Sequence, residues 1–509
     1  MAKRSMSGKR PAITLDQNAA MPLYRQLYER LRSAILAGQL EAHTRLPSTR
    51  TLASELGVSR NTTALAYEML LLEGYIESRV GAGTRVSSLQ AEQLFSPAKP
   101  GKEQREPTLT DPSPRLLAQR VQTLIDTAKS EKFSPSEINA MTNVFRAGQS
   151  DISSFPYETW ARLVAKHARH SLQAVSFYQD AQGYAPLRES IATHIGITRG
   201  VHCSPDQIIL TAGSQGALDL VARVLLDPNA PVWVEDPGYL GARGALLAAG
   251  AKLIPVPVDQ EGMKVEVGRQ LCPQARLAIV TPSHQFPTSV TMSLPRRLAL
   301  LEWAKETGAW IVEDDYDSEF RFSGRPLEAL QGLDGAQRVI YIGTFSKTLF
   351  PSLRLGYLVV PPALLEGFLA TRNFIDTHLP LLEQLALADF MAEGHFARHL
   401  RKMRARYLER RDTLIEALTR ELGELLEIDT PEAGMHLVAW LPLGVSARTV
   451  AEHISMRGLR IFPVVPSTSQ PRQREGLLFG FASASPQELR AGVKLLAPAL
   501  RAGLSGQII

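Results

Sequence analysis

The strongest constraint on the fold is a series of short apolar runs, each of which ends in turn-forming or polar residues. These runs are QIILTAG (207–213), PVWVEDPG (231–238), RLAIVTPSH (276–284), AWIVEDDYD (309–317) and RVIYIGTFSK (338–347). Helical patterns separate them, and this alternation predicts an α/β fold with helices layered on a sheet. Because ligands bind such sheets where the strands end, the polar residues that follow each run are candidate site residues.

The 509-residue chain, with 44% hydrophobic residues, is long enough for two or three domains. Residues 20–87 are patterned as a compact domain. Residues 88–139 are polar and rich in proline, as in FSPAKPGKEQREPTLTDPSPR, and are predicted to form a linker. Residues 140–509 form the α/β domain.

Several classes of protein are disfavoured. No apolar run reaches the roughly 18 residues of a membrane span, and no apolar signal region follows the basic start. Cys203 and Cys272 lie far apart in the chain, which indicates reduced cytoplasmic thiols. We expect no metal site among the eleven histidines and no association with a membrane.

The positive charge is concentrated at the N-terminus. Residues 1–100 contain 13 Lys and Arg against 8 Asp and Glu, an excess of +5 that equals the formal net charge of the whole chain. A local positive field suits a polyanionic partner, although solvated basic surfaces are also common.

The N-terminal residues read as three helices and two short strands. A first helix begins near Pro22, presents Leu27 and Leu31 on one apolar stripe and ends at Gly38. STRTLASELG (48–57) is a second helix, and RNTTALAYEMLLLEG (60–74) is a third. YIESRVGAGTRVS (75–87) then predicts a pair of strands around a glycine turn.

Gly57 lies between the second and third helices, as a helix-turn-helix requires. Arg60, Asn61 and Thr62 begin the third helix, the end that meets base edges in this motif, while Arg50 and Arg85 are placed to contact phosphates. Solvated polar caps are the alternative interpretation for any one of these residues.

Residues 45–86 closely resemble the winged-helix domain of the GntR superfamily in their LPS-x-R, VSR and G-x-G-T elements. The resemblance implies contacts with double-stranded DNA. The candidate DNA-binding residues are Arg50, Ser59, Arg60, Asn61, Thr62, Gly83, Thr84 and Arg85.

GTFSKTLFPSLRLGY (343–357) places Lys347 directly after a buried strand, with Arg354 seven residues later. A lysine is nucleophilic only when it is partly unprotonated, a state that burial and nearby positive charge favour. Arg354 is suited to bind a phosphate, and Thr344 and Ser346 add hydroxyl donors. A surface lysine after a strand is the alternative for this stretch alone.

Three further segments bear on this lysine. Strand alternation places Asp314 and Tyr316 on the same side, where a carboxylate is able to keep a pyridinium nitrogen protonated. TAGSQGALDL (211–220) presents the backbone of Ser214 and Gln215 at a helix N-terminus, which suits a phosphate. Tyr239 offers a ring for stacking. A solvated strand end, an ordinary helix start and a core tyrosine are the respective alternatives.

Taken in order, YQDAQGYAPLRESIA, TAGSQGALDL, EDPGY, TPSHQFPTS, VEDDYDSEF and GTFSKTLFPSLRLGY resemble the fold-type I aminotransferase domain in its MocR/GabR branch. Members of this branch are transcription regulators that bind pyridoxal 5'-phosphate. The resemblance implies a multidomain chain with an N-terminal winged helix, a large three-layer domain and a smaller C-terminal α+β subdomain.

The resemblance also implies residue roles. Lys347 forms the Schiff base (the internal aldimine) with the cofactor, and Asp314 pairs with the ring nitrogen. Tyr316 and either His284 or Gln285 lie near the ring oxygen, and Tyr239 stacks on the ring. The phosphate is held by Ser214, Gln215, Thr344 and Arg354, and by Tyr178 from the other subunit of a homodimer, and Ser346 is a further candidate for binding the cofactor.

Three positions depart from the family pattern. Leu478 stands where aminotransferases carry the arginine that binds the substrate carboxylate, and Gly241 stands where the sensor of γ-aminobutyrate carries a basic residue. Ser289 replaces a glycine. Arg243, Arg472 and Arg474 remain as candidate substitutes for the missing cation.

The sequence therefore predicts a cytoplasmic, homodimeric, DNA-binding regulator that senses pyridoxal 5'-phosphate itself or an amine or amino acid through Lys347. The alternative is a working aminotransferase that carries a DNA-binding domain, against which Leu478 argues. A large domain used only for dimerisation is a third interpretation, which Lys347, Asp314 and Arg354 together disfavour.

Overall fold

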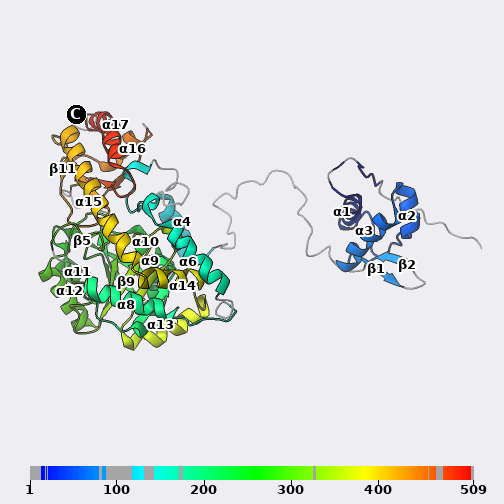
Figure 1. Cartoon of the computed structure of the whole chain (residues 1–509), viewed down its shortest axis with the longest axis horizontal. Coiled ribbons are helices and arrows are strands. Elements are labelled where there is room, and N and C mark those ends of the chain that lie inside the picture. The colour runs from blue at the N-terminus through cyan, green and yellow to red at the C-terminus, as the bar shows by residue number, and fades with distance from the viewer. Residues whose placement is uncertain are drawn as a thin grey trace, which may run out of the picture. The chain divides into compact units, whose positions relative to one another are not determined.

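The computed structural model describes residues 13–17, 19, 21–79, 83–87, 117–130, 143–170, 176–324, 328–456, 458–465 and 474–505. The chain divides into two compact units, residues 1–114 and residues 115–509 (Figure 1). No helix among the described residues is long and apolar enough to cross a membrane.

The N-terminal unit contains three helices and a two-stranded sheet. Its helices are α1 (Leu23–Leu36), α2 (Thr49–Leu56) and α3 (Arg60–Leu72), and its strands are β1 (Ile76–Arg79) and β2 (Gly83–Val86). The strands are antiparallel, with Ile76 opposite Val86. Both side chains are buried against leucines of the helices, so the wing is anchored to the helical core. The predicted order of elements is confirmed.

The larger unit is built on an eight-stranded sheet with the order β3-β10-β9-β8-β7-β4-β5-β6. The strands are β3 (Ile208–Thr211), β4 (Pro231–Asp236), β5 (Lys252–Asp259), β6 (Gly262–Met263), β7 (Leu277–Val280), β8 (Trp310–Asp315), β9 (Val339–Thr344) and β10 (Gly356–Val359). Neighbours from β5 through β4, β7 and β8 to β9 are parallel, and β10 is antiparallel to both β3 and β9.

Helices cover both faces of this sheet. On one face α9 (Gly213–Leu225), α10 (Leu240–Ala248) and α13 (Pro362–Ile375) pack on side chains such as Val232 and Val234. On the other face α11 (Val265–Leu271) and α12 (Leu294–Thr307) pack on side chains such as Trp233. Successive residues of β4 thus point to opposite layers, as the period of a strand requires.

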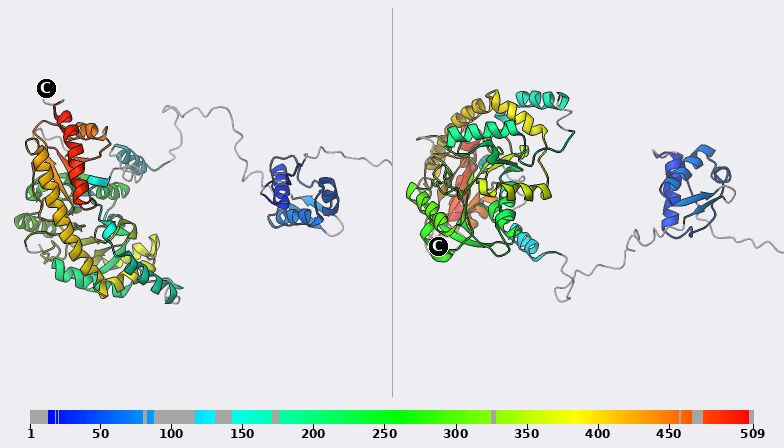
Figure 2. Two further views of the ribbon diagram at one scale, coloured as in Figure 1. Left: turned by 45° about the horizontal axis from the view of Figure 1, so that its top comes forward. Right: turned by 90° about the horizontal axis from the view of Figure 1, so that it is seen from below.

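The C-terminal part forms a smaller antiparallel sheet of order β11-β12-β14-β13. Its strands are β11 (Glu427–Ile428), β12 (His436–Trp440), β13 (Phe462–Val464) and β14 (Gly476–Gly480), and α15 (His395–Leu422), α16 (Ala447–Ser455) and α17 (Pro486–Ser505) accompany it. The long α15 lies beside α17 (Figure 2). This is the smaller subdomain that the resemblance implies.

The remaining elements connect these layers. They are η2 (Asn143–Phe145), η3 (Ile152–Ser154), α6 (Tyr157–His170), α8 (Ala185–Arg199), η4 (Pro205–Gln207), η5 (Pro351–Leu353) and α14 (Leu382–Ala392). Helices α6, α8, α14 and α15 share one hydrophobic core with the smaller sheet.

One stretch departs from the predicted linker. Residues 119–130 form helix α4 (Gln119–Ser130), which packs against α10 and belongs to the larger unit. Val121, Leu124, Ile125 and Ala128 are half-buried and lie at the spacing of one helix face. The polar composition of the surrounding residues concealed this face in the sequence.

Candidate cofactor site and DNA interface

The ends of three strands meet at one edge of the large sheet. In the register of the sheet, Gly356 at the start of β10 lies opposite both Thr211 and Thr344, the last residues of β3 and β9. Asp315, the last residue of β8, lies opposite Gly343 of β9. Asp314, near the end of β8, therefore lies at the same edge as the segments that leave β9 and β3, which carry Lys347 and the start of α9.

Lys347 is half-buried at this edge. Its Nζ atom donates a hydrogen bond to the carbonyl oxygen of Gly148 at 2.7 Å. Burial lowers the pKa of Lys347, the charges of Arg146 and Arg354 lower it further, and Asp317 and Asp314 act in the opposite direction. The amine is thus shifted toward the unprotonated, nucleophilic form.

The acidic residues of EDDYD have different partners. Glu313 accepts hydrogen bonds from two backbone N–H groups at 2.9 Å. Asp315 forms a buried ion pair with an arginine at 2.7 Å, and Asp317 contacts Nδ1 of His284 at 3.1 Å. The Oδ1 atom of Asp314 is buried and has no hydrogen-bond partner. Asp314 therefore presents an unsatisfied acceptor next to Lys347.

Asp314 is also a carboxyl group whose ionisation is disfavoured. Burial, together with the negative charge of Asp315, raises the pKa of Asp314 to about 7, while the charge of Lys347 acts against this shift. A cationic N–H donor placed at Oδ1 would stabilise the ionised carboxylate. The protonated nitrogen of a pyridine ring is such a donor.

His284 and Gln285 have separate surroundings. The hydroxyl group of Tyr316 lies 3.1 Å from Nδ1 of His284. The amide nitrogen of Gln285 donates to Glu235 and to the carbonyl oxygen of Pro237, and its amide oxygen accepts from Thr288. Gln285 is thus engaged by the end of β4, by the segment after β4 and by its own loop, and His284 is the member of the pair that adjoins Tyr316.

An anion-binding arrangement lies at the start of α9. Arg354 donates from Nη2 to the carbonyl oxygen of Ala212 at 2.8 Å, and a Cβ atom on Gly213 would lie 3.3 Å from its guanidinium nitrogens. The guanidinium group therefore lies across the N-terminus of α9, where Ser214 and Gln215 form the first turn. Both the helix terminus and the arginine attract an anion.

Two hydroxyl groups lie nearby on the loop after β9. The Oγ1 atom of Thr344 accepts a hydrogen bond from the backbone N–H of Ser346 at 3.2 Å. The Oγ atom of Ser346 is buried and has no partner. Ser346 thus offers a free donor in the same segment as Lys347.

Tyr239 caps the N-terminus of α10, and burial raises its pKa to about 12. The ring of Phe286 lies edge-on to it at a centroid distance of 5.9 Å. A Cβ atom on Gly241 would lie 2.5 Å from the hydroxyl oxygen of Tyr239 and 2.6 Å from Oε1 of Gln215. This arrangement has no room for a basic side chain at position 241.

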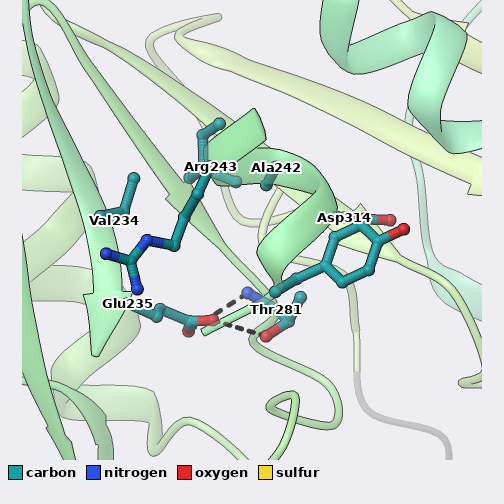
Figure 3. Close-up of a pocket in the computed structure, with 8 residues that line it drawn as sticks. Val234, Glu235, Ala242, Arg243, Thr281 and Asp314 are labelled. Carbon is teal, nitrogen blue, oxygen red and sulfur yellow. Dashed lines mark hydrogen bonds between the residues drawn. The ribbon is translucent and has the colours of Figure 1, made fainter. Parts of the chain in front are cut away.

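A small pocket adjoins Asp314 on the side of β4 and α10 (Figure 3). Glu235 accepts hydrogen bonds there from the hydroxyl and backbone N–H groups of Thr281, and Arg243 lies along the same side of the pocket. Burial raises the pKa of Glu235 to about 7, against the effect of its hydrogen bonds.

The DNA-facing candidates lie on α2, α3 and the wing. Arg50, Arg60 and Asn61 are exposed. Ser59 instead caps α3, since its hydroxyl group accepts from the backbone N–H of Thr62 at 3.1 Å and lies 2.9 Å from the hydroxyl oxygen of Thr62. The exposed arginines and Asn61 are therefore available to a ligand, whereas the two hydroxyl groups hold the helix start.

The wing contains a further cation. Arg85 is exposed and donates to the carbonyl oxygen of His43 at 3.2 Å, and Thr84 lies between Arg85 and Gly83, whose φ is 80°. A Cβ atom on Gly83 would lie 3.2 Å from guanidinium nitrogens of Arg45. Arg45 thus adds positive charge beside the wing, which the sequence alone did not indicate.

Comparison with known proteins agrees with both units. Residues 23–86 match the family of bacterial regulatory proteins of the gntR type, and residues 143–474 match aminotransferase class I and II. The chain is 42% identical, over 96% of each sequence, to a probable rhizopine catabolism regulatory protein, MocR, of Rhizobium meliloti. The chain belongs to the MocR-type regulators of the GntR family.

This MocR-type chain is also similar to a second regulator and to an aminotransferase of known structure. It is 30% identical to a pyridoxine biosynthesis transcriptional regulator, PdxR, of Corynebacterium glutamicum, over 94% of this chain and 96% of the relative. It also superposes on the α-aminoadipate aminotransferase LysN of Thermus thermophilus, complexed with N-(5'-phosphopyridoxyl)-L-leucine. That superposition has a TM-score of 0.65 at 30% identity and covers 77% of this chain and 96% of the enzyme.

Pyridoxal 5'-phosphate is the cofactor of this MocR-type domain, and the residues present fit it. Asp314 offers an unsatisfied buried oxygen for a ring nitrogen, and Lys347 offers an amine of lowered pKa. Arg354 and the N-terminus of α9 offer a site for a phosphate.

The departures from the family pattern also have structural consequences in this MocR-type chain. Leu478 lies on β14 and is buried against Val438 and Val464. Ser289 adopts a φ of 64°, the left-handed conformation that favours glycine, which accounts for the usual glycine at this position. Tyr178 is 87% exposed, and its ring lies beside His378 at a centroid distance of 6.0 Å.

Sequence reasoning missed several residues around Lys347. Gly148 and Arg146 approach it from about 200 positions earlier, and His436 approaches it from the smaller subdomain. His284, Asp317 and His436 form a buried group whose ligand-type atoms lie within 4.8 Å of one another. No local spacing reveals these contacts, and the expected absence of a metal site stays a prediction.

Proposed function

We propose that Lys347 holds pyridoxal 5'-phosphate and that the occupancy of this site regulates the affinity of the winged helix for operator DNA. The observation that carries the proposal is the convergence at one sheet edge of Lys347, the unsatisfied Asp314 oxygen and Arg354 at the start of α9. A structural or purely dimerising domain has no need for an unpaired buried carboxylate, which costs stability.

Different residues of the chain bind different parts of the cofactor. Asp314 accepts a hydrogen bond from the ring N–H group, and Tyr239 stacks on the ring. The hydroxyl group of Tyr316, which contacts His284, donates a hydrogen bond to the ring oxygen. The phosphate is bound by the backbone of Ser214 and Gln215 and by Thr344, Ser346 and Arg354. When bound, the cofactor supplies an aldehyde carbon that bonds a primary amine.

The functional unit is a homodimer. Tyr178 and Phe177 are 87% and 74% exposed, and Phe374 at the end of α13 is 94% exposed. Exposed apolar side chains that form a contiguous patch commonly mark an interface, and the ring contact of Tyr178 with His378 brings the segment after α13 beside Tyr178. We assign this surface to a second copy of the chain, into whose phosphate site Tyr178 reaches. Two winged helices then bind two half-sites on the operator.

The DNA is bound through Arg60 and Asn61 at the start of α3, which read base edges, and through Arg50, Arg85 and the wing, which bind phosphates. A regulator of transcription that binds an operator works in the cytoplasm, and we infer this location for the chain. The signal is pyridoxal 5'-phosphate itself or an amine that reacts at the same site, and either one shifts the population of DNA-binding conformations.

The cofactor claim is tested by absorbance. The purified chain incubated with pyridoxal 5'-phosphate is expected to develop the visible band of a lysine-bound cofactor, and Lys347→Ala is expected to lack it. Retention of the band by the variant, or its absence from the native chain, would overturn the assignment. Operator affinity measured with and without the cofactor then tests the regulatory claim.

A second candidate function is transamination, because Lys347, Asp314 and Tyr316 are all present. Sustained turnover with an amino acid and a keto acid would favour this function. The buried Leu478 in place of a carboxylate-binding arginine is the observation against it.

A further inference from the structure

The carboxylate of Asp317 is buried two residues after the end of β8. Its side chain is 1% exposed, and both of its oxygens lie 3.1 Å from Nδ1 of His284. His284 belongs to the segment after β7, so this contact joins the segments that follow two neighbouring parallel strands. The same Nδ1 atom lies 3.1 Å from the hydroxyl oxygen of Tyr316. One ring nitrogen of His284 thus contacts both a carboxylate and a phenol.

The contact with Asp317 determines where the ring hydrogen of His284 lies. An ionised carboxylate only accepts hydrogen bonds, so Nδ1 carries a hydrogen when it pairs with Asp317. The Nε2 atom of His284 is buried and has no hydrogen-bond partner among the described residues, so a hydrogen on it would be a buried, unpaired donor. Both observations place the ring hydrogen on Nδ1.

Tyr316 keeps its own hydrogen. Burial, together with the negative charges of Asp317 and Asp314, raises the pKa of Tyr316 well above its usual value, so the phenol stays protonated. A hydroxyl group that contacts an N–H group accepts a hydrogen bond from it and does not donate to it. In the described part of the chain, His284 is the hydrogen-bond contact of this hydroxyl group. The hydroxyl hydrogen is therefore available to an oxygen of a ligand.

The ring of His284 is confined from the side of the smaller subdomain. The ring of His436 on β12 lies beside it at a centroid distance of 4.6 Å. Gly434, two residues earlier, adopts a φ of 90°, and a Cβ atom there would overlap the imidazole ring of His284. The backbone N–H of Gly434 donates to the carbonyl oxygen of Phe320 at 2.9 Å, which fixes this close approach. Little room remains for the ring of His284 to change its orientation.

We propose that Asp317 and His284 are positioning residues, which keep the hydroxyl hydrogen of Tyr316 directed at the ring oxygen of the cofactor. His284 donates to the hydroxyl oxygen of Tyr316, and Asp317 holds the ring hydrogen of His284 on Nδ1. Neither residue touches the cofactor in this arrangement. The inference rests on the proposed function, and it replaces a direct contact between His284 and the ring oxygen with an action through Tyr316.

The arrangement prevents a competing hydrogen bond. If Nδ1 of His284 lacked its hydrogen, it would accept the hydroxyl hydrogen of Tyr316. The ring oxygen of the cofactor would then lose a donor and meet a lone pair of the phenol instead. Loss of one hydrogen bond to an ionised oxygen is expected to weaken cofactor binding about tenfold.

Two amides at position 284 test the proposal on the full-length chain. In His284→Asn the amide nitrogen is placed near the position of Nδ1, whereas in His284→Gln the longer side chain places it near the position of Nε2. Titration with pyridoxal 5'-phosphate, followed by absorbance, gives the dissociation constants. His284→Asn is expected to stay within about threefold of the native value, and His284→Gln is expected to bind about tenfold more weakly.

The same pair in a Tyr316→Phe background gives a readout that a packing role does not change. Because His284 acts through the hydroxyl group of Tyr316, the difference between the two amides is expected to fall below about twofold there. Asp317→Asn adds a test of the carboxylate, since an amide is able to donate to Nδ1 and so moves the ring hydrogen to Nε2. A coupling of about tenfold between Asp317→Asn and Tyr316→Phe is expected.

Equal dissociation constants for His284→Asn and His284→Gln would overturn the proposal, whether both are native-like or both are weakened. A difference of the same size in the Tyr316→Phe background would overturn it as well. If His284→Gln does not fold, the cycle of Asp317→Asn with Tyr316→Phe decides, and additive effects in that cycle contradict the positioning role. Failure of the proposed function is distinct, because the native chain then forms no cofactor band at all.

Discussion

The amine of Lys347 donates a hydrogen bond to the carbonyl oxygen of Gly148 at 2.7 Å, across 199 positions of the chain. The same glycine has a φ of 70°, and a Cβ atom there would lie 2.9 Å from Nζ of Lys347. The segment before η3 thus packs closely against Lys347. The position of the lysine amine depends on the absence of a side chain at Gly148.

Gly148→Ala is expected to weaken cofactor binding about tenfold. The added methyl group meets Nζ of Lys347, and the left-handed backbone adds strain of about 1–3 kcal/mol. Titration with pyridoxal 5'-phosphate, followed by absorbance, measures the effect. Gly335→Ala is the control, because a Cβ atom there meets no atom within 4 Å, and an equal loss in both variants would contradict the prediction.

Asp314→Asn is expected to stabilise the cofactor-free chain at alkaline pH. Because burial raises the pKa of Asp314 from 3.8 to about 7, its ionisation is more costly in the folded state than in the unfolded state. Stability therefore falls as the pH rises from about 4 through about 7, and asparagine removes this loss. The melting temperature of the variant should exceed the native value by roughly a few degrees at pH 8 and by less at pH 5.

The same variant is expected to bind the cofactor at least about tenfold more weakly, since a neutral amide does not stabilise a protonated ring nitrogen. Asp315→Asn is the contrasting control. It leaves a buried arginine without its ion pair and should lower the melting temperature at both pH values. Unchanged cofactor affinity in Asp314→Asn would contradict its assigned role.

The positions of the candidate site residues at strand ends could be predicted from the sequence, because only neighbouring residues determine them. Lys347, Asp314 and the start of α9 each follow an apolar run directly, so the end of the strand itself locates them. Arg354 was found through its spacing from Lys347. In each case, a few neighbouring residues determine the position.

Contacts between distant segments escaped the same reasoning. Gly148 and His436 reach Lys347 only after the smaller subdomain and the segment before η3 have packed against the large sheet. The choice between His284 and Gln285 depends on hydrogen bonds to residues 48 and 32 positions away, Pro237 and Tyr316, which no periodicity reveals. Helix α4 was hidden because its apolar face has four residues in a polar segment.

The role of Tyr178 in the partner subunit is testable with mixed dimers. Tyr178→Ala should lower cofactor affinity although the side chain is 87% exposed in the single chain. A dimer that pairs a Tyr178→Ala chain with a Lys347→Ala chain then has one site with both residues. We expect that dimer to bind one cofactor with native affinity, whereas action within one chain would leave no intact site. Tyr157→Ala, at another exposed tyrosine, is the control for loss of an aromatic surface residue.

Arg60→Ala is expected to weaken operator binding and to relax its sequence preference, because Arg60 is exposed at the start of α3. Loss of one base contact costs about 1–3 kcal/mol. Arg85→Ala should instead weaken binding to all sequences alike and reduce the slope of log affinity against log salt by about 1. Binding measured at several salt concentrations, with specific and scrambled DNA, separates the two effects. Arg25→Ala removes the same charge from α1, where Arg25 lies 3.8 Å from Glu29, and serves as the control. If Arg25→Ala and Arg60→Ala lower affinity equally for both DNAs, the winged helix does not read bases through α3.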